Sequence, residues 1–253
     1  MPLLLIALFL SGWQVLASTR ILNPALFPAP TKILNELVAL HTKELPVRSV
    51  LFTHTWITVQ RTFIAAGLGI IAGILTGVLM GVSQPLYRFC DPLITLLMPI
   101  PGIAMAPLFI IWLGFGNPTI ITLGIIATFF PVVYNTAAGV RSMDKQLVRA
   151  ARIMGAHPLE ILFTIYLPWA AGHTLTGVKL GLARCWRTII AVEFVAAASW
   201  GLGYMIWNAA EYLRAGVVYG GIGLLIVLYF LLEQLVLVPL EKHTVEKWGM
   251  IKT

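Results

Sequence analysis

The sequence predicts an all-α membrane protein that crosses the bilayer about six times. Of its 253 residues, 59% are hydrophobic and only 11% are charged, whereas a soluble domain is nearer a quarter charged. Apolar stretches of about 20 residues, the length that a membrane-spanning helix needs, also recur along the chain. We therefore expect a single transmembrane domain over residues 1–253, with spans near residues 2–19, 62–84, 94–112, 119–140, 174–200 and 217–237.

The first expected span is Met1–Thr19, which carries no charged side chain. A signal peptide is the alternative interpretation. A retained helix is favoured because the segment lacks a basic beginning and because Ser18-Thr19-Arg20 is a poor cleavage site.

The second span belongs to a charge-free stretch from Thr62 to Tyr87. Its small residues recur at every fourth position and form one slowly winding stripe, at which a neighbouring helix can approach closely. We interpret this stripe as a helix-packing surface, formed by Gly69, Gly73, Gly77 and Gly81.

The third and fourth spans come from Pro92–Val140, which contains no acidic or basic residue and is long enough for two crossings. The turn Gly114–Pro118 separates them. Pro99 and Pro101 should break or kink the third span. Disrupted helices in a bilayer lie against protein or a water-filled cavity, so the bend is either a plain kink or part of a pathway.

The last two spans follow a more polar segment. Ile161–Val178 is apolar, but Pro168 and His173 interrupt it, so we interpret it as an interfacial segment that leads into the fifth span. Six spans place both termini on one side. The distribution of Lys and Arg has a small bias toward that side, which favours cytoplasmic termini.

The loop at residues 141–170 should form two short helices. Asp144–Met154 suits the first helix, on which Ala150 and Ala151 leave a close-approach surface. Gly155 can end that helix with left-handed dihedral angles, and Pro158 fits the first turn of the second. Phe163, Ile165 and Leu167 offer apolar contacts, and Pro168 should stop the run.

The spacing of Ala150-Ala151, Gly155-Ala156 and Leu167-Pro168 resembles the EAA cytoplasmic loop of the permease subunits of bacterial ABC importers. The resemblance implies that this loop docks on a separate ATPase subunit. The implied coupling residues are Arg149, Ala150, Ala151, Gly155, Ala156, His157, Pro158, Phe163, Leu167 and Pro168. The first position departs from the family, because Arg149 stands where Glu is usual, so an ion pair at that position is in doubt.

The similarity extends over roughly residues 25–245. Four segments carry it, namely 27–30, 106–116, 175–193 and 201–204, and they resemble the branch that imports sulfonates, taurine, nitrate, bicarbonate and pyrimidine precursors. The resemblance implies a homodimer in the bacterial inner membrane, two ATPase copies that use ATP and Mg, and an extracytoplasmic solute-binding protein. This chain would bind no metal or cofactor, would catalyse no reaction, and would pass a small anionic or polar solute.

Ionisable residues inside the fifth span need a reason, because each costs about 2.5–3.5 kcal/mol on insertion scales. Arg184 and Arg187 share a helix face, and they either reach the headgroups or line a pathway. Glu193 lies close to the face of Trp186, and two interpretations stay open for it. It is either the partner of a buried Arg or backbone donor, or it lines a cavity or gate. The candidate pathway residues are Glu193, Arg187, Trp186, Pro99 and Pro101.

Other functions have less support in the sequence. The net charge of +7 is scattered rather than gathered into a basic face, which argues against nucleic-acid binding. There is no phosphate-binding loop of the Gly-x-x-x-x-Gly-Lys-Ser/Thr type. The five histidines are dispersed, so a membrane enzyme is disfavoured. An ion-gradient-driven secondary transporter remains the alternative, although no internal repeat of the kind seen in that class is visible.

Overall fold

A computed structural model describes residues 2–19, 23–42 and 49–242, and these residues are helical almost throughout. The two chain ends, residue 1 and residues 243–253, lie outside the described residues. The helices are α1 (Pro2–Ser18), α2 (Pro30–Thr42), α3 (Val50–Val82), α4 (Gln84–Leu97), α5 (Gly102–Leu113), α6 (Asn117–Arg141), α7 (Lys145–Ile153), α8 (Pro158–Ile161), η1 (Leu162–Tyr166), α9 (Leu167–Ala196), α10 (Leu202–Glu211), α11 (Ala215–Leu232), η2 (Glu233–Leu237) and α12 (Val238–Glu241).

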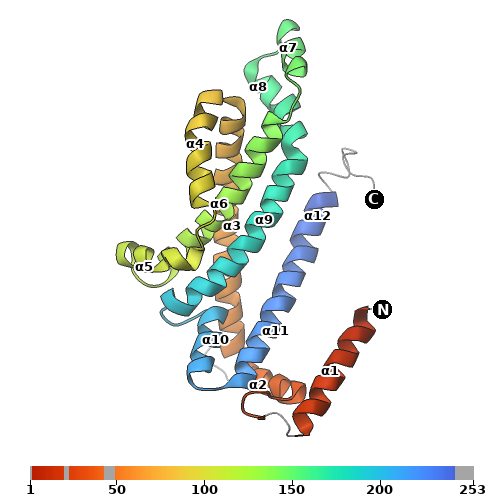
Figure 1. Ribbon diagram of the computed structural model, residues 1–253, viewed down its shortest axis with the longest axis vertical. Helices are drawn as coiled ribbons and strands as arrows, with labels where there is room; N and C mark the ends of the chain where they lie inside the picture. Colours follow the sequence, from red (N-terminus) through yellow and green to blue (C-terminus); the bar gives the residue numbers. More distant parts are fainter. Residues whose placement is uncertain (1, 20–22, 43–48, 243–253) are drawn as a thin grey trace.

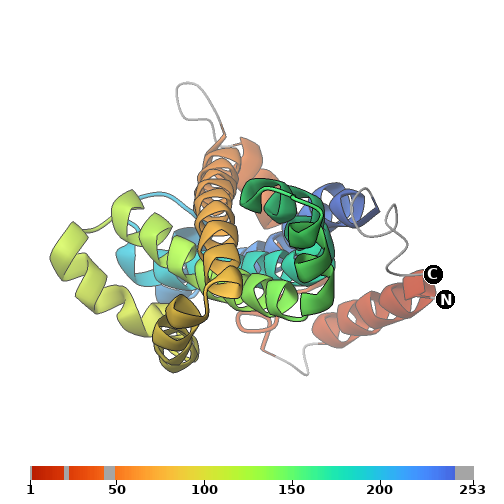
Figure 2. The same ribbon diagram turned by 90° about the horizontal axis from the view of Figure 1, so that it is seen from above.

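The core is formed by three long helices, α3, α6 and α9, which pack side by side along the length of the molecule (Figure 1). The α7–α8 segment extends from one end of this core, and α2 and α10 lie at the other. Figure 2 shows α5 and α1 on opposite sides of the core.

Glycines let α3 and α6 approach each other over four turns. A Cβ atom built on Gly69 would lie 2.6 Å from the Cβ of Thr128, and one on Gly81 would lie 2.4 Å from the Cβ of Val140. Gly73 and Gly77 meet Val132 and Thr136 in the same way, each at 2.7 Å. The stripe that was interpreted as a packing surface therefore faces α6, and side chains of α6 pack directly against the backbone of α3 there.

The all-α, multi-span class is confirmed. Among the described residues, three helices have the length and apolar composition of a membrane span: α3, α6 and the continuous helix Ala215–Glu241. α4 and α5 together add a bent fourth. α9 has 30 residues but carries several ionisable side chains, and α1 is a shorter apolar helix.

The second span begins earlier than expected. α3 starts at Val50 rather than near residue 62. The start of this span was expected near residue 62 because Arg61 precedes the charge-free stretch, and a charged side chain usually marks the end of a span. Arg61 is instead buried within the helix bundle and paired with an acid.

The third span also requires correction, because residues 94–112 do not form one continuous crossing. α4 and α5 meet at an angle of 101°, and the break contains Pro99 and Pro101, which lack the N–H that a helix needs. Arg184 donates a hydrogen bond to the carbonyl of Met98 and fills this gap. The break in the helix at these prolines was predicted correctly. The expectation that residues 94–112 cross the membrane as one span was wrong.

Pro168 does not end a helix, contrary to expectation. The chain is helical from Pro158 through Ala196, and the wider turn of η1 lies just before the proline. A π-helical turn accommodates a residue that cannot donate to the regular ladder. The segment that was expected to lie at the membrane interface is therefore the first part of one long helix. Within that helix, α9 begins at Leu167 rather than near Thr174. The final helix contains a second such turn, η2, one residue before Pro239.

Candidate coupling and pathway sites

The α7–α8 tip is built by local capping interactions. Asp144 caps α7 by accepting a hydrogen bond from the amide of Gln146 at 2.8 Å. Gly155 has φ +85°, the left-handed conformation at which a helix commonly ends. His157 then caps α8, and Glu160 reciprocates by accepting from the His157 amide. These contacts set the two helices at an angle and close the turn between them.

A small apolar cluster holds the tip together from inside. Ala151 is buried with Met143, Val148 and Ile161. Ala151 therefore faces α8 within this chain, whereas its neighbour Ala150 is exposed.

The outer surface of the tip is more apolar than the sequence analysis expected. The side chains of Ile153 and Met154 are 87% and 80% exposed, and Leu147, Leu159 and Phe163 are exposed as well. Of these exposed residues, the sequence predicted only Phe163 as an apolar contact. Ile153 and Met154 could also have been predicted, since they directly precede Gly155, the glycine that ends the helix.

The ten residues implied by the resemblance fall into three groups. Arg149, Ala150, Gly155, His157, Pro158 and Phe163 are exposed, Ala156, Leu167 and Pro168 are half-buried, and Ala151 is buried. The exposed group surrounds the apolar surface. Arg149 has no ion pair with another described residue.

At the other end of the core, Glu193 is fully buried in a network of polar contacts. Its Oε1 accepts from Arg61 Nη1 at 2.7 Å, and its Oε2 accepts from the Gly203 amide at 2.9 Å. Thr58 Oγ1 donates to the same carboxylate and accepts from the amide of Leu202 at 2.7 Å. Such pairing offsets the cost of burying a charge.

The Arg61 guanidinium continues the network to two further elements. Nη1 also donates to the carbonyl of Trp200 at 2.7 Å, and Nε donates to Asn117 Oδ1 at 2.8 Å. The network therefore connects α3, the first residue of α6, the end of α9 and the turn before α10. We call these residues (Thr58, Arg61, Asn117, Glu193, Trp200, Leu202 and Gly203) the Arg61 cluster.

Gly201 makes this arrangement possible. Its φ of +140° is a conformation that side chains rarely adopt, and a Cβ atom there would lie 2.5 Å from the carboxyl carbon of Glu193. His54 Nδ1 lies 2.9 Å from the carbonyl oxygen and 3.1 Å from the amide nitrogen of Gly201, and according to its tautomer it donates to the first or accepts from the second. The turn after α9 can therefore close directly over the acid.

The remaining pathway candidates lie elsewhere. Trp186 is buried and Arg187 is exposed, and both line a cavity of about 650 Å³ between α9 and α11 together with Phe194, Tyr229 and Glu233. Pro99 and Pro101 are exposed at the α4–α5 break. The structure therefore does not bring the five candidates into one site.

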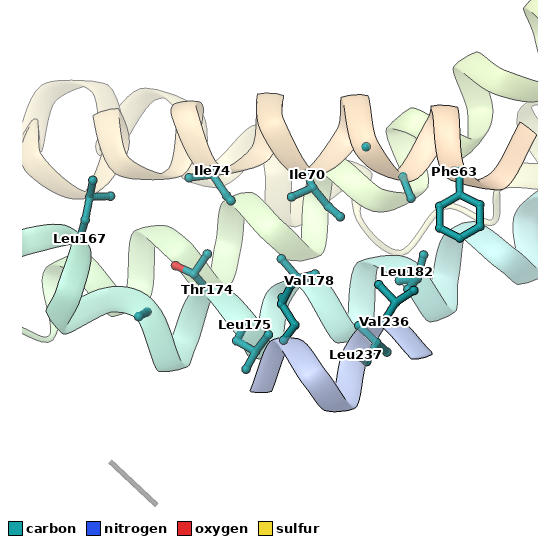
Figure 3. Close-up of a pocket in the computed structure, with 14 residues that line it drawn as sticks. Phe63, Ile70, Ile74, Leu167, Thr174, Leu175, Val178, Leu182, Val236 and Leu237 are labelled. Carbon is teal, nitrogen blue, oxygen red and sulfur yellow. The ribbon is translucent and has the colours of Figure 1, made fainter. Parts of the chain in front are cut away.

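A second cavity suits hydrocarbon rather than a polar solute. It has a volume of about 450 Å³ and lies between α3, α9 and the end of the last helix, η2–α12. Figure 3 shows Phe63, Ile70, Val178 and Val236 pointing into it, with Thr174 contributing the one labelled oxygen atom. Among the described residues, no group of three or more His, Cys, Asp or Glu side chains could hold a metal ion.

The fold is a multi-span helical bundle with a capped two-helix tip at one end. Residues 69–238 match the family model described as "Binding-protein-dependent transport system inner membrane component", and the chain belongs to this family. It is the transmembrane permease subunit of an ABC importer, in the multi-pass form that the family shares.

Similarity to individual proteins agrees with this assignment. The chain is 34% identical to the taurine transport system permease protein TauC of Escherichia coli (strain K12), over 90% of this chain and 82% of TauC. It is 26% identical to the nitrate import permease protein NrtB of Synechocystis sp. (strain ATCC 27184 / PCC 6803 / Kazusa), over 95% of this chain and 90% of NrtB. The fold is similar to a chain of the MetNI methionine ABC transporter in inward-facing conformations, with a TM-score of 0.63, 23% identity, and coverage of 76% of this chain and 96% of that one.

Proposed function

We propose that this chain forms the translocation pathway for a small anionic solute, with sulfonates as the first class to test. Taurine is itself a sulfonate, and both TauC and NrtB are named for the import of solutes that carry an oxyanion group. Family membership also favours the importer over an ion-gradient-driven transporter. ATP dependence of uptake separates the two.

The exposed apolar surface of the α7–α8 tip is the observation that supports a partner ATPase. Five large apolar side chains reach solvent there on a short, well-capped unit, and apolar patches rimmed by polar groups mark protein-binding surfaces. In this proposal two ATPase copies bind ATP and Mg, and this chain holds no cofactor. Arg149 is exposed at the rim, so the docking contact there lacks the acid that the family usually supplies.

The other partners are proposed from the shape of the bundle. A second copy of this chain would cover the exposed apolar surface of the α4–α5 pair, where Ile111 is 80% exposed and Phe115 is 65% exposed. An extracytoplasmic binding protein would deliver the solute to the end that carries α10. Both termini would be cytoplasmic, because α1 runs away from the tip end and α12 runs toward it (Figure 1).

The first experiment is to purify the tagged chain gently and to identify co-purifying proteins by mass spectrometry. We expect a stoichiometric P-loop ATPase with the wild-type chain and its loss with Gly155→Asp. Ala210→Asp is the matched control, because Ala210 is also exposed but lies on α10 at the end of the core opposite the tip.

Two results would contradict the proposal. One is a clean preparation without any ATPase, in both lipid and mild detergent. The other is equal loss of the ATPase in Gly155→Asp and Ala210→Asp, which would indicate general misfolding rather than a docking surface at the tip.

A further inference from the structure

A polar pocket lies beside the Arg61 cluster, at the end of the core opposite the α7–α8 tip. It has a volume of about 280 Å³ and lies between α3, the start of α6 and the turn after α9. Its polar lining residues are Gln60, Arg61, Asn117 and Ser199, and Ile57 and Ile64 complete the α3 wall. The pocket is therefore small and polar, unlike the two larger apolar cavities.

Two of the acceptor atoms next to this pocket are already used, whereas Gln60 and Ser199 each offer both an acceptor and a donor. Asn117 Oδ1 and the Trp200 carbonyl both accept from Arg61. The two carboxylate oxygens of Glu193 are bonded inside the Arg61 cluster, and that residue is fully buried. Because the assigned Asn117 oxygen faces a donor-only guanidinium, its NH₂ group is left as a donor.

Donors remain on the pocket side. Arg61 is 94% buried, yet its Nη2 has no hydrogen-bond partner among the described residues. Among the described residues, Thr136 Oγ1 is the side-chain polar atom that is fully buried and has no hydrogen-bond partner. Nη2 has no partner either but does not belong to this group, so it is not fully buried. It therefore reaches accessible space, and the residue lines this pocket. The Ser199 hydroxyl and the Gln60 amide add further donors.

The electrostatics favour an anion that binds weakly. The charges of Arg61 and Glu193 cancel, so the pocket holds no strong net positive charge. α6 begins at Asn117 without a side-chain cap, and the free amides of a helix N-terminus contribute a modest positive potential. A site that offers hydrogen bonds with little net charge can hold an anion briefly and release it, as a transport pathway requires.

We propose that this pocket binds the oxyanion group of the transported solute, a sulfonate in the first instance, as it enters the permease. The inference rests on the proposed importer function for the identity of the solute. The geometry of the donors rests on the structure alone. A lipid phosphate offers the same chemistry, and the experiment is designed to separate the two sources.

The test measures charge-selective labelling at a single cysteine. Ser199→Cys is made in a Cys90→Ala background, with the buried Cys185 left in place. The purified importer complex is treated with a sulfonate-bearing methanethiosulfonate reagent and with its trimethylammonium analogue of similar size. Ala210→Cys, which lies exposed on α10 at the same end, is the matched control.

We expect the ratio of anionic to cationic labelling rates to be about tenfold higher at position 199 than at position 210, which corresponds to about 1.4 kcal/mol of preference. Adding Gln60→Leu should lower the ratio without touching the Arg61 cluster. Ethanesulfonate at millimolar concentration should slow labelling at position 199 and not at position 210.

Equal ratios at the two positions would overturn the proposal. Protection by a bilayer of anionic lipid, without protection by ethanesulfonate, would assign the pocket to a headgroup and would overturn the solute assignment. If charge selectivity and protection hold while the complex imports no sulfonate, the pocket stands and the proposed function fails. Labelling and uptake therefore report on the two proposals separately.

Discussion

At the scale of single residues, the structure contains two ion pairs of opposite character among its described side chains. Arg61 and Glu193 lie 2.7 Å apart with side chains 7% and 0% exposed. Lys179 and Glu241 lie 2.5 Å apart, but both side chains are about one-third exposed. The buried pair is surrounded by further hydrogen bonds, whereas the half-exposed pair joins α9 to α12 near the surface. Their removal should therefore have very different costs.

Arg61→Gln should destabilise the protein strongly, because it leaves the fully buried Glu193 without its countercharge. The expected loss is about 3–5 kcal/mol. Lys179→Gln should cost about 0–1 kcal/mol, the value of a solvent-screened pair. Unfolding of the purified chain in mixed detergent and lipid micelles measures both. Similar losses in the two variants would contradict the structural role given to the Arg61 cluster.

Single residues also show where sequence reasoning reached its limit. Of the two interpretations left open for Glu193, one was a buried Arg partner, and the structure pairs it with Arg61, 132 positions away in the sequence. The sequence shows that residue 61 is charged, but it does not show which side chain Arg61 contacts. The local signals were more informative, since Gly155 and Pro158 were both placed correctly at the turn from their own backbone preferences.

At the scale of elements, the contact between α3 and α6 depends on glycines that let side chains of α6 pack directly against the backbone of α3. Four glycines on one face of α3 leave no room for a Cβ atom. Gly67 lies on the same helix with nothing within 4 Å of a Cβ built there. The two kinds of position allow the packing contribution to be separated from helix propensity.

Gly77→Ala should destabilise the protein by about 1–3 kcal/mol, since the new methyl group would lie 2.8 Å from the carbonyl oxygen of Val133 and would force the helices apart. Gly67→Ala should be neutral or slightly stabilising, because alanine is the better helix former. Thermal unfolding in detergent provides the comparison. A Gly67→Ala variant as unstable as Gly77→Ala would mean that chain flexibility, not packing, sets the effect.

Elements were predicted well where a long apolar run carried no charged residue, as in α6, which continues through Pro131. Pro99 and Pro101 were expected to break or kink the third span, and the chain turns by 101° there, so that residues 94–112 do not form one straight helix. Pro168 was read as a stop, and the helix continues through it by way of η1. A proline alone does not reveal whether the neighbouring structure can absorb its missing hydrogen bond, because that depends on tertiary contacts.

At the scale of the whole molecule, the bundle has two chemically different ends. Met154 marks the tip end and Leu213 marks the end that carries α10, and each of these side chains is 80% exposed. The long helices of the core lie between them (Figure 1). This matched exposure makes the pair suitable for testing which end faces the cytoplasm.

Met154→Cys, in the Cys90→Ala background and expressed without the partner ATPase that would cover this surface, should react with a membrane-impermeant maleimide only after the cells are permeabilised. Leu213→Cys should react in cells whose inner membrane is intact. Gel-shift labelling of the two variants at equal expression reads out the orientation. The reverse pattern would invert the proposed topology and would place the ATPase at the wrong end of the molecule.

The helix that continues from Pro158 to Ala196 has a mechanical consequence. At about 1.5 Å per residue it is roughly 55–60 Å long, with its first turn at the α7–α8 tip and its last turn held by the hydrogen bonds of Glu193. A rod of that length, tilted by about 10°, moves one end relative to the other by about 10 Å. Because η1 lies within the first turns rather than at midspan, the remainder can act as a stiff lever. A small displacement of the tip would then arrive at the far side of the membrane as a movement of solute-sized amplitude.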